Sequence, residues 1–265
     1  MVAMPRDVPI AQAATVMLVD DRPDLHVLMV RRTPAAVFGG GLWVFPGGRV
    51  DPADRSAPDA IQGLDQRDKA DLDVDHPSSF WVAAVRETLE ETGILLATDR
   101  SGAWASRDDA APLREALLEG HPLGALLAAG GWRLPADRLH YVAQWITPPG
   151  PPRRFDARFF LTAAPPHTEA DHDDDELVDA AWVRPQEVVD DPAFGLMSPT
   201  ERMLRSLARF GSAAEALAVA AGRPPWQRAR VVVDHAGRHE VLLPGEAGYR
   251  AGAEDVERGW VRLVK

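Results

Sequence analysis

The sequence of 265 residues contains no cysteine, and this absence removes several kinds of chemistry at once. Without thiols the chain cannot form disulfides, thiolate zinc sites or a cysteine nucleophile. Long apolar runs are also missing, because no stretch of about 18 uncharged apolar residues occurs. The N-terminus lacks a basic segment followed by an apolar core. We therefore expect a cytoplasmic protein without a membrane-spanning segment.

Positive charge is in short supply, because 29 Lys and Arg residues face 40 Asp and Glu residues and leave a formal net charge of −11. This balance disfavours attraction to a nucleic-acid backbone or to an anionic membrane. Small anionic substrates stay open, because a few local arginines and a bound metal outweigh the global field at contact distance. The sequence therefore favours a small-molecule partner over a nucleic-acid polymer.

An acidic helix is the most informative feature that is present. Residues 86–94 read Arg-Glu-Thr-Leu-Glu-Glu-Thr-Gly-Ile, and Glu87, Glu90 and Glu91 fall on one helical face because they are three and four residues apart. We expect Gly93 to end the helix, so these acids also crowd the end where the macrodipole favours cations. Neighbouring like charges and acids at a helix C-terminus are both unfavourable, and their occurrence at one place indicates a compensating ligand. A hard divalent cation suits carboxylates. A solvated acidic face is the alternative.

The opposite face of this helix is predicted to be core, on the residues Trp81, Val82, Val85, Leu89 and Thr92. Upstream, a short apolar run at 42–45 ends in Pro46-Gly47-Gly48, with acids such as Asp54 behind it. Paired glycines permit unusual backbone angles and let a backbone carbonyl approach a ligand closely. These two stretches, the diglycine turn and the acidic helix, are the ones that carry chemistry.

Together they resemble the signature of the Nudix hydrolases, which runs Gly, five residues, Glu, seven residues, then Arg-Glu-aliphatic-x-Glu-Glu-x-Gly-aliphatic. The second half is matched by Arg86, Glu87, Glu90, Glu91, Gly93 and Ile94, and the first half by Gly48. Asp54 stands where the family has Glu, and Thr88 where it has an aliphatic residue. We call the residues of these two halves the split motif.

The split motif is interrupted, because residues 55–85 separate its two halves where the family has seven residues. A branch of the superfamily that resembles peroxisomal coenzyme A diphosphatases carries an insertion at this point. We read the insertion, 55–77, as a surface loop with one short helix that caps or narrows the site. The lack of cysteine argues against the isopentenyl diphosphate isomerase branch, which uses a catalytic Cys.

The resemblance implies an α/β fold, a Nudix α/β/α sandwich with a mixed sheet, in one domain that spans 1–265. Its core covers about 15–190, and a helical extension with a terminal β-hairpin follows at 195–265. Local patterns predict strands at 14–19, 25–31, 43–45, 139–145, 155–161 and 181–183. They predict helices at 113–119 and 122–129, helix starts at Ser198 and Ser212, and a hairpin from 231–233 and 240–243.

The activity that the resemblance implies is hydrolysis of a phosphoanhydride bond in a nucleoside diphosphate derivative, with Mg²⁺ or Mn²⁺ as cofactor. The implied metal ligands are Glu87, Glu90, Glu91 and the carbonyl of Gly48. Arg86 is expected to orient a ligand glutamate rather than to touch substrate. The resemblance implies that the catalytic base is a glutamate of the split motif, such as Glu90, or an acid of the stretch 167–176. In that stretch we choose Glu176.

The sequence does not decide between several possible substrates. Arg32 matches an arginine that coenzyme A diphosphatases carry upstream of the glycine turn, whereas their second arginine is Val37 here. Arg154 and Arg158 share one face of the strand at 155–161 and are predicted to receive phosphate. Coenzyme A or an acyl derivative, a dinucleotide and a sugar nucleotide all stay open. A Nudix domain that binds a nucleotide without cleaving it is the alternative function, and the resemblance implies a homodimer as one assembly.

Overall fold

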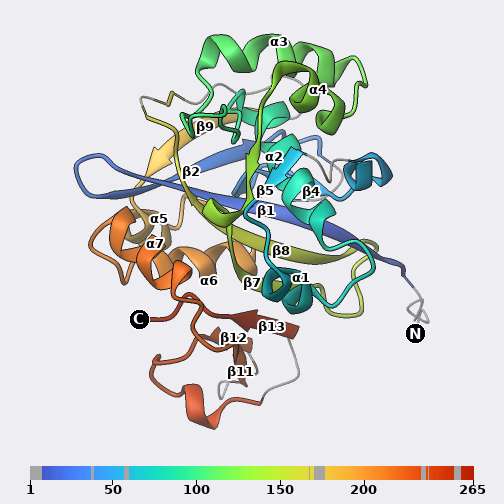
Figure 1. Ribbon diagram of the computed structural model, residues 1–265. Coiled ribbons are helices and arrows are strands. Elements are labelled where there is room, and N and C mark those ends of the chain that lie inside the picture. Colours follow the sequence, from blue (N-terminus) through green and yellow to red (C-terminus); the bar gives the residue numbers. More distant parts are fainter. Residues whose placement is uncertain are drawn as a thin grey trace.

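The computed structural model describes residues 8–36, 39–56, 60–166, 168–169, 177–233, 237, 239–253 and 258–265. Its central sheet is built, in chain order, from β1 (Ile10–Asp21), β2 (Leu25–Arg32), β3 (Trp43–Val44), β4 (Gly47–Arg49), β7 (His140–Ile146), β8 (Arg154–Ala163), β9 (Leu177–Val183), β10 (Gln227–Arg228) and β13 (Arg258–Val261). The order across this mixed sheet is β10-β13-β7-β8-β1-β2-β3, with β4 paired to β1 and β9 paired to β2. Figure 1 shows the long strands β1 and β8 side by side in this sheet.

The helices are α1 (Gln66–Leu72), α2 (Ser78–Thr92), α3 (Arg107–Leu118), α4 (Leu123–Gly130), α5 (Pro185–Asp190), α6 (Ser198–Leu207) and α7 (Ala213–Ala221). Short 3₁₀ turns are η1 (Pro52–Ser56), η3 (Ala136–Arg138) and η4 (Tyr249–Ala251). Two small sheets pair β5 (Ile61–Gln62) with β6 (Leu134–Pro135), and β11 (Arg230–Val233) with β12 (His239–Leu242). The terminal hairpin that the sequence predicts is therefore confirmed.

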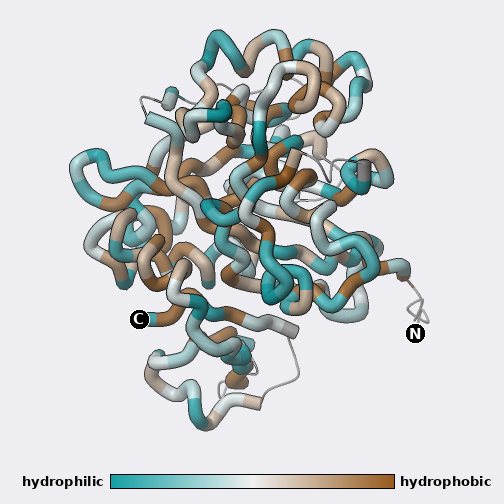
Figure 2. Tube along the Cα trace, viewed as in Figure 1, coloured by the Kyte–Doolittle hydropathy of each residue, from teal (hydrophilic) through white to brown (hydrophobic). Residues whose placement is uncertain are grey.

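Both faces of the sheet are covered, because two separate apolar cores lie on either side of it. One core joins α2 to Val16 and Leu18 of β1, and the other joins α6 and α7 to Met17 and Val19 of the same strand. A strand buried on both faces needs a helical layer on each side. Figure 2 shows the hydrophobic stretches along the central strands and the hydrophilic ones along the outer loops. The α/β/α sandwich with a mixed sheet is thus confirmed.

The long strand pair β1–β8 fixes which side chains share a face. The two strands run parallel, from Ile10 opposite Arg154 to Val19 opposite Ala163. Successive side chains of a strand point to opposite faces. Arg158 and Phe159 therefore lie on different sides of the sheet, and this alternation decides below which of them meets the site.

Several predicted elements differ in extent from the observed ones. α3 begins at Arg107, six residues before the predicted start, because Ser106 and Asp109 form a capping box. α6 begins at Ser198 itself, so that Ser198 is its first residue and not its cap. The strand β13 was not predicted, and it joins the central sheet beside β7.

The insertion 55–77 contains one short helix, α1, as predicted, but it packs more firmly than a surface loop. Leu72 is 2% exposed and belongs to the core on the α2 side of the sheet. The C-terminal segment holds α1 through two ion pairs, Arg223–Asp68 and Arg262–Asp71, each 2.7 Å long. Within the part of the chain described above, no helix combines the length and apolarity needed to cross a bilayer.

Candidate active site

The acidic helix of the sequence is α2, and its apolar stripe lies in the core as predicted. The predicted core residues are each at most 1% exposed: Trp81, Val82, Val85, Leu89 and Thr92. Gly93 ends the helix in the left-handed region, with a φ of 69° and an N–H that donates to the Leu89 carbonyl. Thr88 fits where an aliphatic residue is usual because its buried hydroxyl donates to the Ala84 carbonyl at 2.7 Å.

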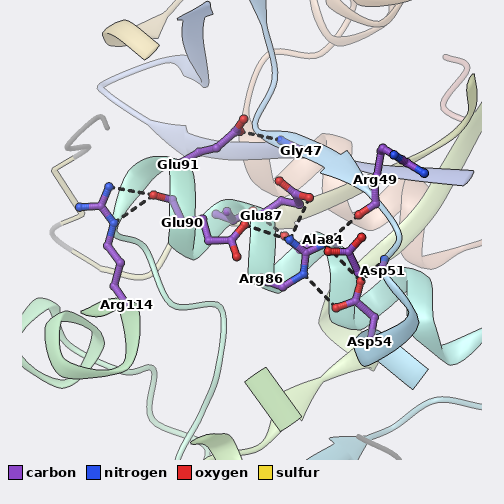
Figure 3. A network of polar contacts seen from close by, with 11 residues as sticks. Gly47, Arg49, Asp51, Asp54, Ala84, Arg86, Glu87, Glu90, Glu91 and Arg114 are labelled. Carbon is purple, nitrogen blue, oxygen red and sulfur yellow. Dashed lines mark hydrogen bonds and ion pairs between the residues drawn. The ribbon is translucent and has the colours of Figure 1, made fainter. Parts of the chain in front are cut away.

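The diglycine turn meets the glutamate face of α2. The Gly47 N–H donates to Glu91 Oε2 at 2.8 Å (Figure 3). A Cβ on Gly48 would lie 2.5 Å from the carboxylate atoms of Glu87, so any other residue here would displace that carboxylate from its present position. The structure therefore brings together the two stretches that the sequence marked as carrying chemistry.

Arg86 is 8% exposed and contacts two of the three glutamates on the acidic face of α2, which is formed by Glu87, Glu90 and Glu91. One Nη lies 2.9 Å from Glu90 Oε2 and 3.0 Å from Glu87 Oε1. Its Nε donates to Asp54 Oδ1 at 2.9 Å, and the other Nη donates to the Arg49 carbonyl at 2.7 Å. With its donors committed in this way, Arg86 holds the carboxylates of Glu87 and Glu90 beside its guanidinium (Figure 3).

The carboxylates are not fully compensated by this one arginine. Burial raises the pKa of Glu87 to about 7, although Arg86 opposes the rise. Burial also raises the pKa of Glu90, again against the pull of Arg86. A further positive charge beside these two carboxylates would therefore favour their ionised form.

A hard divalent cation would supply this positive charge, although the carboxylates predicted to bind it do not surround one point in the structure. Among the described residues, no three Asp, Glu or His side chains stand as a ready-made metal cluster. Glu87 and Glu90 pair with Arg86 instead, and Glu91 accepts from Gly47. The donor set of carboxylate oxygens beside a glycine carbonyl is nevertheless the kind that Mg²⁺ and Mn²⁺ prefer.

A cavity of about 920 Å³, here called the main cavity, opens beside the acidic face. One end is lined by Gly47, Gly48, Glu87, Glu90 and Glu91. The rest is largely apolar, with walls that include Phe45, Trp145, Phe155, Phe159 and Met197. This volume is sufficient for a drug-sized ligand with one charged and one apolar part.

Three arginines line the main cavity: Arg32, Arg49 and Arg153. The sequence predicted Arg32, whose buried Nε has no hydrogen-bond partner among the described residues. It missed Arg49 and Arg153, because only the folded chain shows that a residue of the diglycine turn and one of the loop before β8 reach the same cavity. Guanidinium groups at a cavity wall suit anionic oxygens such as phosphate.

Arg154 and Arg158 do not line the main cavity, so this cavity gives no support to the prediction that they receive phosphate, which stays a prediction. Phe155 and Phe159 take the cavity face of β8, and strand alternation sends the arginines to the other face. There Arg158 pairs with Asp156 at 3.0 Å, and its Nη2 donates to the Leu72 carbonyl of α1.

The insertion does not border the main cavity through any of its described residues. α1 lies instead on the face of the sheet that carries Arg158. The expectation that the insertion caps or narrows the site is therefore wrong for these residues. The predicted base Glu176, the stretch 170–176 and Val37 fall outside the described residues.

Known proteins similar to this chain were found by sequence and by structure. No family model matches the sequence. A nudix hydrolase of Caenorhabditis elegans is 29% identical over 170 residues, which span 64% of this chain and half of the length of that relative. The human acyl-coenzyme A diphosphatase NUDT19 is 26% identical over 88% of this chain and 74% of its own length. The crystal structure of a NUDIX hydrolase from Alicyclobacillus acidocaldarius superimposes with a TM-score of 0.69 and 29% identity, over 80% of this chain and 96% of that one.

Proposed function

The chain belongs to the Nudix hydrolase superfamily, and from that premise we propose that it hydrolyses a phosphoanhydride bond in a nucleoside diphosphate derivative with Mg²⁺ or Mn²⁺. The observation that carries the proposal is the contact between the glutamate face of α2 and the diglycine turn, at the end of a large cavity. A phosphoanhydride resists hydrolysis because its negative oxygens repel a nucleophile. The chain must therefore supply positive charge and an oriented water.

Glu87, Glu90, Glu91 and the Gly48 carbonyl would hold the metal ion, which when bound neutralises phosphate oxygens and acidifies water. Arg86 keeps Glu87 and Glu90 on the cavity side of α2 through its two ion pairs. Arg86 is in turn held by Asp54, which is 2% exposed. Glu90 and Glu176 stay the two candidates for the base that takes a proton from the attacking water.

Coenzyme A or an acyl derivative is the substrate that we propose. The likeness to a human acyl-coenzyme A diphosphatase supports this choice. So does the composition of the main cavity, because three arginines suit the phosphates and the apolar wall suits a long leaving group. The cytoplasmic location and the homodimer stay predictions from the sequence.

The test is a panel of diphosphates that includes coenzyme A, an acyl-coenzyme A, a dinucleotide and a sugar nucleotide. We expect magnesium-dependent cleavage of the coenzyme A compounds into two phosphorylated products, identified by mass spectrometry. Glu90→Gln and Glu91→Gln should each abolish turnover with little loss of fold. Tight binding of a nucleotide without cleavage would instead support the non-catalytic alternative.

Two adjacent arginines offer a matched pair for the substrate contacts. Arg153 lines the main cavity, whereas the side chain of Arg154 donates to the Thr147 carbonyl. We expect Arg153→Gln to raise KM for a coenzyme A substrate by about tenfold, as loss of a charge-assisted phosphate contact predicts. Arg154→Gln should leave KM close to that of the wild type. Equal effects would contradict the assignment of the cavity face.

A further inference from the structure

A second arginine, Arg114, reaches the acidic helix from outside the split motif. Its Nε and one Nη donate to the backbone carbonyl of Glu90 at 3.0 and 2.8 Å (Figure 3). Arg114 belongs to α3, which follows α2 in the chain and packs against it. Two donors of one guanidinium therefore fix the single carbonyl that precedes Glu91.

The Glu90 carbonyl lies in the last turn of α2, where carbonyls lose their partners within the helix. The Ile94 N–H would donate to it if the helix continued. The structure instead shows this N–H donating to Thr92 Oγ1 at 3.3 Å, while the Gly93 N–H donates to Leu89. Arg114 thus provides the hydrogen bonds that the end of the helix has left open at Glu90.

The charge at the C-terminal end of α2 also favours a guanidinium there. The C-terminal end of a helix carries partial negative charge, and α2 has no basic residue in its last turn. Glu90 and Glu91 add two carboxylates at that end. A guanidinium on the Glu90 carbonyl offsets both the dipole and the neighbouring acids.

The two arginines hold different parts of the acidic face. Arg86 binds side chains and acts on Glu87 and Glu90. The Glu91 carboxylate contacts the diglycine turn, because its Oε2 accepts from the Gly47 N–H. The placement of Glu91 against the diglycine turn therefore depends on where the backbone of the last turn lies, and this is the backbone that Arg114 holds.

We propose that Arg114 is a positioning residue, which fixes the last turn of α2 and thereby the placement of Glu90 and Glu91 for a divalent cation. The proposal rests on the metal-dependent function proposed above. Groups that orient ligands in this way are worth about 10- to 100-fold in metal affinity where they have been removed. Arg114 does not line the main cavity and is not expected to touch substrate.

The simpler interpretation is that Arg114 only ties α3 to α2 and so stabilises the fold. The control for this interpretation is Arg209 just after α6, whose Nη1 donates to the Pro244 carbonyl at 2.8 Å and whose other Nη pairs with Glu246 at 3.3 Å. Arg114→Gln and Arg209→Gln each remove a guanidinium from a backbone carbonyl. Both are expected to lower the melting temperature.

Binding of Mn²⁺ to the substrate-free protein separates the two interpretations, and it is measured by electron paramagnetic resonance. We expect Arg114→Gln to weaken Mn²⁺ binding about tenfold and to raise the Mg²⁺ concentration needed for half-maximal turnover by a similar factor. KM for the diphosphate at saturating metal should change less than twofold. Arg209→Gln should leave the Mn²⁺ affinity unchanged.

Arg114→Lys keeps the charge and one hydrogen bond, and it should bind Mn²⁺ about threefold more weakly than the wild type. If Arg114→Gln does not fold, Arg114→Lys takes its place in the measurement of Mn²⁺ binding. Wild-type Mn²⁺ affinity in the folded Arg114 variants would overturn the proposal while leaving the proposed function intact. A wild-type protein that binds no Mn²⁺ and cleaves no diphosphate would overturn both.

Discussion

Asp54 and Arg86 form a buried ion pair that joins the two halves of the split motif. The Arg86 Nε lies 2.9 Å from Asp54 Oδ1, and one Nη lies 3.2 Å from Oδ2. Residues 55–85 separate the two partners in the chain. Such a separation is tolerated because the entropy of closing a loop grows only logarithmically with its length. The pair therefore holds the two halves together across the insertion.

Asp54→Asn is expected to damage both stability and activity. The change leaves the Arg86 guanidinium buried without its principal partner, which lowers the free energy of unfolding by about 3 kcal/mol. It also loosens the anchor of Glu87 and Glu90, so kcat should fall at least tenfold. Denaturation in urea and steady-state kinetics measure the two effects.

The control is Asp51→Asn, because Asp51 is 3.9 Å from Arg86 and its side chain is 58% exposed. An exposed pair of this kind contributes about 0–1 kcal/mol. If Asp51→Asn destabilises the protein as much as Asp54→Asn does, the buried pair is not what holds the two halves together.

Gly48→Ala tests the close approach of the diglycine turn to Glu87. The added Cβ would lie 2.5 Å from the Glu87 carboxylate and would push it away from the turn. We expect loss of Mn²⁺ binding and a fall in kcat of about 100-fold, because misplacement by about 1 Å is costly at a reacting centre. The comparison is Gly211→Ala, whose Cβ would meet Glu215 Oε2 only at an ordinary 3.7 Å. Full activity in Gly48→Ala would contradict the role assigned to the turn.

The parts of the site that sequence predicted are those whose residues contact one another. The glutamates of α2 and the diglycine turn were predicted together, because both belong to the Nudix signature that the sequence resembles. The sequence could not place the arginines of β8 relative to the cavity, because alternation shows that Arg154 and Arg158 share a face but not which face borders the cavity. Arg114 was missed because its partner is a backbone carbonyl, which leaves no pattern in the sequence.

The elements of the fold also differ in how well the sequence predicts them. Strands with apolar runs, such as β1 and β2, were found because their central positions, 16–19 and 27–30, are buried. The strand β13 was missed because it has four residues, including Gly259, and pairs with β7 only through tertiary context. The early start of α3 could have been found, since Ser106 and Asp109 have the spacing of a capping box.

Glu87→Gln is expected to stabilise the metal-free protein at alkaline pH. Burial raises the pKa of Glu87 to about 7 from an ordinary 4.5, so the folded state holds its proton where the unfolded state has lost it. Stability therefore falls as pH rises from about 4.5 to 7, and the cost is fully present at pH 8. Removing the charge should raise the free energy of unfolding by about 1–3 kcal/mol at pH 8 in EDTA.

The difference between Glu87→Gln and the wild type should shrink as pH falls toward 4.5, because both side chains are then neutral. Thermal melts between pH 4.5 and 8, with EDTA and with excess Mg²⁺, measure it. Glu119→Gln removes a charge from a side chain that is 67% exposed and should change neither curve. A Glu87→Gln protein less stable than the wild type at pH 8 without metal would show that the carboxylate is not strained by burial.

The C-terminal segment holds the insertion through Arg262. This side chain is 5% exposed, pairs with Asp71 of α1 at 2.7 Å and lies 3.7 Å from the ring centroid of Trp226. Arg262→Met keeps much of the packing volume and removes the charge that faces Asp71. Because Asp71 is partly exposed and stays hydrated, we expect a loss of about 1–3 kcal/mol rather than unfolding.

Hydrogen exchange should locate the effect of Arg262→Met in α1, where amide protection falls, while α2 keeps its protection. Activity should stay within about twofold of the wild type, because no described residue of the insertion lines the main cavity. Arg205→Gln, which breaks a half-buried pair with Glu201 on α6, should leave exchange in α1 unchanged. Unaltered exchange in α1 of the Arg262 variant would mean that the insertion is held by its buried Leu72 rather than by the C-terminal segment. A large loss of activity would mean that α1 influences the site across the sheet, since it does not border the main cavity.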